Sequence, residues 1–448
     1  MLVSHKHYQF YLIFLRRKGK RDKSFRVRTY ILIIIVNLVT AASITGQSAK
    51  SYMRDTVSKV KMLDSARYKQ EDVMDEITKV IKVRAKEPVD SESLKPGKIL
   101  VSIFPAVGYS LSNGVTFILA TNFSFYTDDP KTTNLSVISF NPLYSLKQQF
   151  IAPLISSIWL ANNKINLLGD YRFYQYPSLT YGLGGKRLLS QSDSVDFSYI
   201  KISQEALYTI AHNLYVGGGY NFDDHYNIEN LSNDDRQYIR YTYGAKQTIS
   251  SGWVARLKYD SRENINNPKD AFYADLTYRD NLTALGSTSN WQEVAVEFRK
   301  YITLSKYPSN ELAFWSWNEY TYGGDVPYFD LPSTGWDEYS NTGRGFIQGR
   351  FRGSDIVYLE GEDRFDILRN GLLGGVVFCN GESVPNYPSN KFEAIHIGKG
   401  IGLRIKLNKY SNTNLCIDYG WGDEGSRGHQ YQRRRTLTAS GCRACEEG

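Results

Sequence analysis

The sequence predicts an all-β protein: a transmembrane antiparallel β-barrel of 16 strands, of which 15 are recognisable. Three observations favour this fold. Tyr and Phe are abundant, with 34 and 21 residues, although the mean hydropathy is negative, as suits a sheet with one lipid-facing and one wet face. Apolar and polar residues alternate over segments of about 9 to 14 residues, longer than soluble strands usually are. An export signal precedes these segments.

The N-terminus has the composition of a targeting segment. The basic stretch RRKGKRDKSFRVR is followed by the apolar run TYILIIIVNLVTA and the small residues of SITGQSAK. The apolar core, 30–42, is shorter than the roughly 20 residues that span a bilayer as a helix. We therefore interpret 1–46 as an over-extended start plus a signal peptide cleaved after Gly46, with an uncleaved anchor as the alternative.

A polar linker is expected at 47–98. Its one periodic feature is an apolar stripe at helical spacing, formed by Val73, Ile77, Val80 and Ile81. This spacing predicts a short helix ahead of the barrel.

The barrel itself is expected at 99–428. In GVTFILATNFSFY, Val115 and every second residue after it are mostly apolar, whereas the residues between them are more polar. GIGLRIKLN repeats the pattern, with Arg404 and Lys406 on one face and four aliphatic residues on the other. Two basic side chains on one strand face should point into a wet lumen, because lipid would not solvate them. A soluble sandwich remains the alternative for any single strand.

The strand pattern recurs fifteen times. The predicted ranges are 99–110, 113–126, 132–142, 148–161, 164–176, 194–209, 212–224, 251–262, 270–281, 289–303, 309–322, 353–366, 371–381, 395–408 and 412–421. Bacterial barrels have an even number of strands, because an odd number leaves an unpaired edge in lipid. A sixteenth strand is therefore expected at the C-terminal end.

The tail 429–448 does not alternate and contains three consecutive arginines. Codons for HQYQRRRT, read one nucleotide later, can encode the alternating segment ININ, so we interpret the tail as aberrant and hypothesise a frameshift near Gly428. On this view the CxxC of Cys442 and Cys445 is not a metal or redox site. Cys379 and Cys416 lie in strand-like segments as small buried or lipid-facing residues, with a disulfide as the alternative.

The net charge of +8 is concentrated at the termini. Residues 1–46 hold nine Lys and Arg and one Asp, and 429–448 hold four Arg and two Glu, so 47–428 carries 41 basic and 43 acidic residues. A near-neutral body does not favour nucleic acid as a partner.

The long connection at 323–352 contains the motif GRGFIQGRFRG. An arginine drawn into a confined lumen needs a carboxylate partner, and a glycine beside it lets the backbone approach the wall. From these residues alone, Arg344 could equally be a solvated loop residue, with Arg350 and Arg352 as surface charges facing lipopolysaccharide.

GRGF, FRG, LEGEDRF and GLLGGVVFCNG together resemble the C-terminal half of the BamA/TamA family of outer-membrane barrels, the bacterial surface antigen superfamily. In that family an Arg-Gly-Phe/Tyr loop between strands eleven and twelve folds into the lumen, and its arginine meets acidic residues on strands twelve and thirteen. The resemblance places Arg344, Gly345 and Phe346 in the motif, and Glu362 in the acidic position of strand twelve. YDSRENINNPKDAFYADL is similar to the family's turn at the base of the barrel.

The chain departs from the family pattern at three points. Asn380 stands where an aspartate is usual, which makes the second partner of the arginine a neutral acceptor. Asp270 stands where a turn glycine is usual, which is tolerable because Asp can adopt positive φ. Residues 47–98 are too few for a POTRA domain, so recruitment of clients by the family's usual route is in doubt.

The resemblance implies a barrel in the outer membrane of a Gram-negative bacterium that assists insertion or translocation of proteins or lipids, through a weak seam between its first and last strands. The alternative is a passive pore or structural barrel. The expected partners are outer-membrane lipids, lipopolysaccharide and other outer-membrane proteins, with the chain itself a monomer. We expect no catalytic residues, cofactor or metal, since His212, His225 and His396 are scattered and neither GxSxG nor HExxH occurs.

Overall fold

The computed structural model describes residues 70–73, 75–76, 96–230, 246–264, 267–306, 308–409 and 413–423. The predicted signal peptide and the aberrant tail lie outside these ranges. Of the predicted helical stripe only Val73 is described, and it is helical, as are Asp75 and Glu76. No helix in the described ranges is long and apolar enough to cross a membrane.

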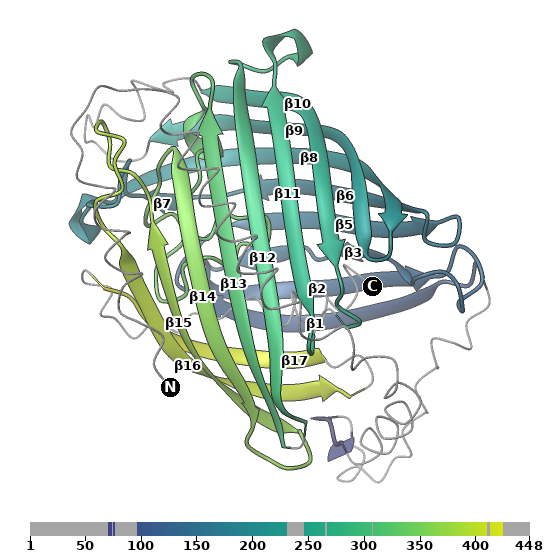
Figure 1. Cartoon of the computed structure of the whole chain (residues 1–448). Helices are drawn as coiled ribbons and strands as arrows, with labels where there is room; N and C mark the ends of the chain where they lie inside the picture. The colour runs from purple at the N-terminus through teal and green to yellow at the C-terminus, as the bar shows by residue number, and fades with distance from the viewer. Residues whose placement is uncertain are drawn as a thin grey trace, which may run out of the picture. The chain divides into compact units, whose positions relative to one another are not determined.

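The described strands form one antiparallel sheet (Figure 1). They are β1 (Leu100–Ser110), β2 (Gly114–Phe125), β3 (Ser136–Phe140), β4 (Leu143–Ser145), β5 (Phe150–Leu160), β6 (Ile165–Gln175), β7 (Ser178–Thr180), β8 (Asp193–Ala211), β9 (Leu214–Asn230), β10 (Gln247–Asp260), β11 (Phe272–Asn281), β12 (Trp291–Lys306), β13 (Ser309–Tyr322), β14 (Asp355–Asp366), β15 (Leu373–Ser383), β16 (His396–Asn408) and β17 (Thr413–Trp421).

Each of the fifteen predicted strands is confirmed, and two short strands were not predicted. β3 and β4 both lie between β2 and β5, so they are two pieces of one stave. β7 continues the pairing of β6 along β8. The remaining pairs follow chain order from β8 to β17.

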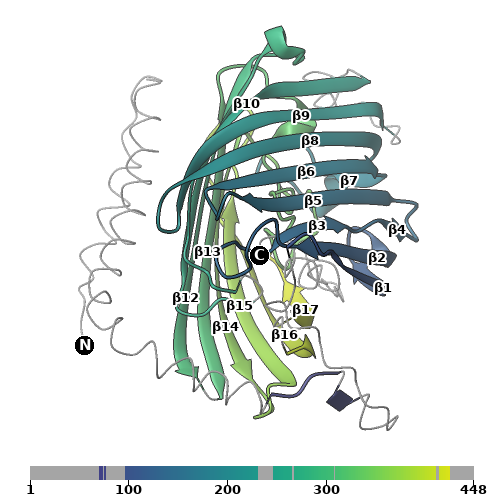
Figure 2. The same ribbon diagram turned by 90° about the vertical axis from the view of Figure 1, so that its right-hand side faces the viewer.

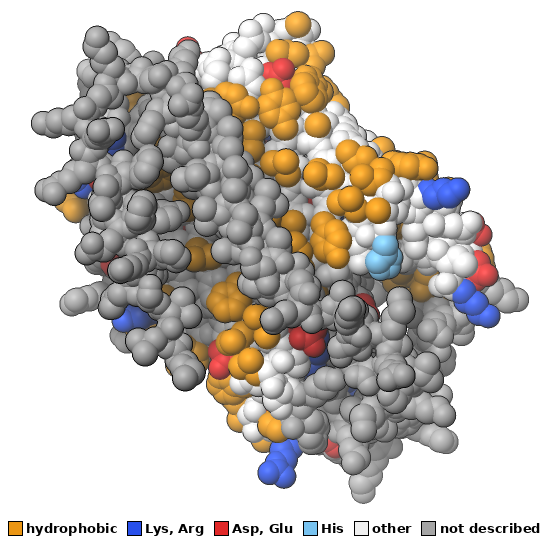
Figure 3. Space-filling model, in the orientation of Figure 1, with side chains coloured by type: hydrophobic (Ala, Val, Ile, Leu, Met, Phe, Trp, Pro, Cys, Tyr) orange, Lys and Arg blue, Asp and Glu red, His pale blue; other side chains and the backbone are white. Residues whose placement is uncertain are grey.

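The predicted alternation is also confirmed. Phe117 and Ile401 are each 54% exposed on the outer face, whereas Ala120 and Lys406 are buried on the inner face. Figure 3 shows hydrophobic side chains spread over much of the visible outer face, with basic side chains mostly at its margins. An apolar outer face around a polar interior is what a lipid-embedded barrel requires.

The first and last described strands are the edges of the sheet. β1 pairs with β2 and β17 with β16, and no hydrogen-bonded register joins β1 to β17 within the described ranges. The sheet curves round, and β17 lies near the β1–β2 hairpin in both views (Figures 1 and 2).

The connection between β13 and β14, residues 323–354, is here called the inner loop. Its Phe346 and Phe351 pack with Trp317 and Tyr358 on one side of the barrel. Its Phe329 packs against Phe197 on β8 with ring centroids 4.5 Å apart. The loop therefore lies inside the curve of the sheet and contacts inner faces far apart in sequence.

Asp270 adopts the positive φ expected at a turn position where glycine is usual. Asp270, ahead of β11, has φ 46°, and its carboxylate accepts a hydrogen bond from the backbone N of Thr303 at 3.0 Å. A short polar side chain tolerates this conformation, so glycine is not required there.

Candidate functional site

Arg344 is the centre of the site. The inner loop carries its side chain against the inner face of β14 to β17, where it is 1% exposed. Its Nη1 donates to Glu362 at 2.7 Å and to Glu360 at 3.0 Å, and its Nη2 donates to Asp418 at 2.5 Å. Three charge-assisted hydrogen bonds on one guanidinium join the loop to two strands.

Two further arginines complete what we call the arginine network. Arg404 on β16 donates to Asp418 at 2.5 Å, and Arg364 on β14 donates to Glu362. The Tyr358 hydroxyl donates to Glu360 at 2.6 Å. The network thus holds three arginines and three carboxylates, and this balance makes burial of the charges tolerable.

The surroundings of Arg344 keep it charged. Burial by itself would lower its pKa, but the negative charges of Asp418, Glu360 and Glu362 outweigh burial and raise the pKa well above its ordinary value. The guanidinium carbon also lies 3.5 Å from the ring centre of Phe378 on β15. A cation over an aromatic face in a desolvated site adds to the attraction.

Gly345 and Phe346 fix the loop beside Arg344. Gly345 has φ 102°, and a Cβ there would lie 2.8 Å from the backbone of Trp421 at the end of β17. Only glycine permits both the conformation and the close approach. Phe346 is fully buried, and its ring meets that of Phe351 edge to face at 5.4 Å.

Asn380 does not have the role expected of it. Its Nδ2 donates to the backbone O of Arg344 at 2.8 Å, whereas we expected it to accept from the guanidinium. The guanidinium hydrogen-bonds to three carboxylates instead. Asn380 can bind the backbone carbonyl of Arg344 because a neutral amide donates hydrogen bonds, whereas a carboxylate does not. The two carboxylates beside Glu362 come from Glu360 and Asp418, which were not predicted from the sequence.

The signal for these two residues is present but weak. Glu360 is two residues from Glu362 and therefore on the same face of β14. Asp418 is 2% exposed beside Ile417, which is 38% exposed; this alternation predicts an inward acid on β17 but not its partner.

Arg350 and Arg352 are not surface charges, in contrast to the alternative interpretation of the sequence. They are 1% and 3% exposed. Arg350 donates to the backbone O of Arg187 at 2.5 Å, and Arg352 donates to that of Tyr328 at 2.8 Å. Both are drawn inward with the inner loop, because backbone carbonyls there accept from their guanidinium groups.

The inner loop also reaches the other edge of the sheet. The backbone N of Gln348 donates to Ser112 Oγ, in the β1–β2 turn, at 3.2 Å. Tyr176 links the same two places, because its hydroxyl contacts Gln348 Oε1 at 2.7 Å and Asn113 Oδ1 at 3.2 Å. Residues 345–348 therefore contact β17 on one side and the β1–β2 turn on the other.

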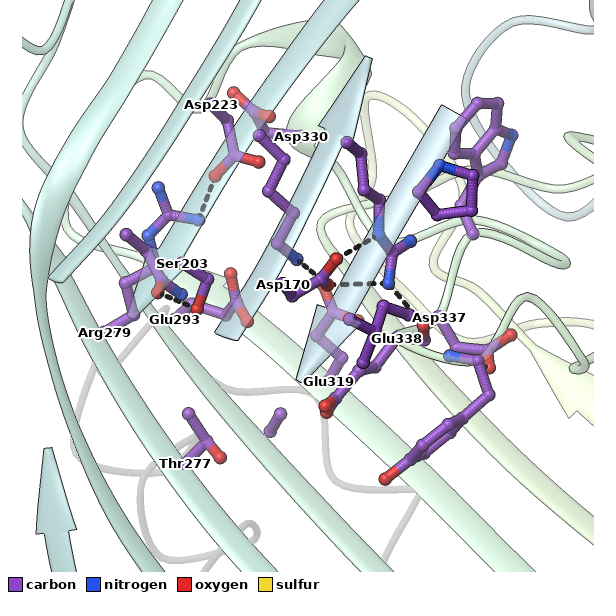
Figure 4. A pocket seen from close by; sticks show the side chains of 18 of the residues that line it. Asp170, Ser203, Asp223, Thr277, Arg279, Glu293, Glu319, Asp330, Asp337 and Glu338 are labelled. Atoms are coloured by element: carbon purple, nitrogen blue, oxygen red, sulfur yellow. Dashed lines mark hydrogen bonds and ion pairs between the residues drawn. The ribbon is translucent and has the colours of Figure 1, made fainter. Parts of the chain in front are cut away.

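Beyond this loop segment the lumen contains a charged cavity of about 270 Å³ (Figure 4). Paired charges line it: Arg279 Nη1 meets Asp223 at 2.6 Å, and Arg172 Nη2 meets Asp170 at 2.7 Å. The inner loop contributes Asp330, which accepts from Ser250 Oγ at 2.6 Å. Burial, followed by the charge of Asp223, raises the pKa of Asp330 to about 7.

The three histidines considered in the sequence have separate surroundings. His212 is exposed after β8, His225 lies 3.5 Å from Asp330, and His396 stacks on Phe351 with ring centroids 3.8 Å apart. The described residues contain no group of three or more His, Cys, Asp or Glu suited to a metal ion.

The chain matches no protein-family model and no curated protein sequence. Its fold is similar to that of BamA from Haemophilus ducreyi lacking POTRA domains 1–3, with TM-score 0.50 and 16% identity over 74% of this chain and 68% of that one. It is also similar to CdiB from Escherichia coli, with TM-score 0.50 and 10% identity over 74% of this chain and 60% of that one. The fold is thus a barrel of the kind found in BamA and CdiB.

Proposed function

We propose that this chain is a BamA/TamA-like barrel in the outer membrane of a Gram-negative bacterium, where it assists insertion or translocation of proteins or lipids. The observation that carries the proposal is the inner loop, because Arg344 ties it to β14 and β17 while Gln348 ties it to the β1–β2 turn. A loop that contacts both edges of a sheet can hold them together or let them separate.

The edges themselves support this proposal. A ladder between two strands contributes a row of backbone hydrogen bonds, which hydrocarbon makes costly to break. Within the described ranges β1 and β17 share no ladder, and the inner loop contacts both β17, through Arg344, and the β1–β2 turn, through Gln348.

The second candidate is a passive pore, and the charged cavity favours it. The cavity is lined by both signs of charge and lies among the inner faces of β5, β6, β8 to β13 and the inner loop. A polar, solvent-sized space inside a barrel is a feature of channels.

One reconstitution separates the two candidates. The full chain is placed in liposomes, and the folding rate of an urea-unfolded eight-stranded barrel protein is compared with that in protein-free liposomes; conductance is recorded in planar bilayers. Faster folding without steady conductance supports assembly. Steady conductance with an unchanged folding rate supports the pore. If neither faster folding nor steady conductance is observed, both candidate functions are wrong.

A matched control tests whether any faster folding of the client depends on the inner loop. The Arg344→Ala variant breaks the contact of the loop with β17, whereas Asp128→Lys changes an exposed charge outside the site. If the loop governs the edges, only Arg344→Ala changes the folding rate of the client.

A further inference from the structure

Residues 70–73 and 75–76, here called the strap, lie at the end of the sheet opposite the inner loop. Connections at the two ends of an antiparallel sheet alternate, so the β14–β15 turn (367–372) and the connection that begins at Lys409, after β16, share the end that the inner loop does not occupy. In Figure 1 the strap is the short purple segment near these turns.

The strap is bound to the β14–β15 turn through Asn370. The backbone N of Glu71 donates to Asn370 O at 3.0 Å, and Asn370 Nδ2 donates back to the Glu71 carboxylate at 2.5 Å. The Gln70 side chain lies against Gly371, where a Cβ would be 3.8 Å from it. A reciprocal pair of hydrogen bonds fixes the register of the strap on this turn.

The strap is bound to the β16–β17 hairpin through Lys409. The backbone N of Lys409 donates to Asp72 Oδ2 at 2.9 Å, and its Nζ lies 2.8 Å from both carboxylate oxygens of Asp75. Lys406 Nζ adds a longer contact of 3.5 Å to Gln70. Two of the strap's carboxylates, those of Asp72 and Asp75, therefore contact Lys409 at the base of the last described hairpin.

The strap is also organised for this contact. Asp72 N donates to the Asp75 carboxylate at 2.9 Å, and Asp75 N donates to the Asp72 carboxylate at 3.0 Å. This reciprocal arrangement satisfies backbone donors that the first turn of a helix leaves unpaired. Asp72 is only 4% exposed, so its second oxygen is directed at Lys409 without rearrangement.

We propose that the strap is a releasable clamp, whose docking on the surface formed by Asn370, Gly371, Lys406 and Lys409 joins the β14–β15 and β16–β17 turns. The arginine network holds the middle of the β16–β17 hairpin through Arg404 and Asp418, whereas the clamp holds its turn end. Release of the strap loosens only the turn end of this hairpin.

The contacts indicate how release is controlled. The side chains of Lys409 and Asp75 are 21% and 29% exposed, so salt screens their attraction. The contact of Asp72 with the Lys409 backbone is only partly accessible to solvent, since Asp72 is 4% exposed, and it persists at high salt. High ionic strength therefore weakens the clamp in part, and loss of Asp72 removes it.

A charge-swap experiment on the full chain in liposomes tests the clamp. Backbone hydrogen exchange is followed by mass spectrometry in peptides covering 70–76, 367–372 and 405–412. The variants are Asp75→Lys, Lys409→Asp, the double swap Asp75→Lys with Lys409→Asp, and Asp72→Ala. Asp128→Lys, an exposed charge change in the connection after β2 at the same end of the sheet, is the control.

Each single reversal should speed exchange in all three peptides about fivefold, as expected for a partly exposed ion pair. The double swap should restore the wild-type rates, Asp72→Ala should exceed both single reversals, and Asp128→Lys should change nothing. Exchange that is equal in wild type and in Asp72→Ala would overturn the clamp. Single reversals that the double swap does not rescue would overturn the pairing of Asp75 with Lys409.

Discussion

Replacing Arg344 with alanine should destabilise the barrel more than any other single arginine substitution in the network. Arg344 is 1% exposed and donates to three carboxylates. After its removal Glu362 keeps Arg364, Asp418 keeps Arg404, and Glu360 keeps the Tyr358 hydroxyl. One negative charge then remains uncompensated among buried groups, which costs about 3 kcal/mol, the lower end of the range for a broken buried pair.

The measurement is urea unfolding of the barrel in liposomes, followed by tryptophan fluorescence. A loss of about 3 kcal/mol corresponds to roughly a hundredfold change in the folding equilibrium. The matched control is Arg364→Ala, whose side chain is 26% exposed and whose loss should cost about 1 kcal/mol or less. A double-mutant cycle of Arg344→Ala with Glu362→Gln should show coupling above about 0.5 kcal/mol.

Two results would refute this reasoning. Equal unfolding midpoints for wild type and Arg344→Ala would mean that the network does not stabilise the barrel. An equally large effect of Arg364→Ala would mean that burial and the number of partners do not determine the cost.

Three further predictions concern residues around the network. Gly345→Ala should destabilise the barrel by more than the about 1 to 3 kcal/mol that a strained backbone conformation usually costs, because the added Cβ also meets the backbone of Trp421. Gly286→Ala is the matched control, since Gly286 has φ 96° but nothing within 4 Å of the added Cβ. Equal losses of Tm in the two variants would count against the close approach. Asn380→Ala should lower the free energy of unfolding in urea by about 1 kcal/mol, as the loss of one neutral hydrogen bond does. Asp418→Asn should lower it clearly more, because Arg344 and Arg404 both lose a charged partner. The reverse order would contradict the roles given to Asn380 and Asp418. The pKa of Asp330 is raised from 3.8 to about 7 in the folded protein, so between these pH values the folded state holds a proton that the unfolded chain releases. The resulting contribution to the free energy of unfolding is complete below pH 3.8 and is lost as the pH rises to about 7. The Asp330→Asn variant should lack that part of the dependence of stability on pH, and identical dependences in variant and wild type would disprove the shift.

The strands were predictable because alternation is a local property. Outward Ile401 and Leu403 and inward Arg404 and Lys406 can be assigned from the order of residues alone. β4 and β7 were missed because each has only three residues, too few to show a period. Their positions depend on pairing with β5 and β8, which are distant in sequence.

The site was predictable only in part, for a related reason. Arg344, Gly345, Phe346 and Glu362 came from a motif resemblance. Asp418 is 74 residues from Arg344, and it meets the arginine only because the sheet curves round. Asn380 was assigned as an acceptor because sequence gives the residue type but not which atom of Arg344 lies beside it.

Arg344 holds β17 in place, and hydrogen exchange along β17 tests this role most directly. In liposomes the backbone amides of 413–421 should exchange at least about tenfold faster in Arg344→Ala than in wild type, since a loss of about 1.4 kcal/mol or more in local stability has that effect. Amides of β11 and β12, which do not contact Arg344, should be unchanged. Equal exchange of β17 in the two proteins would contradict the claim.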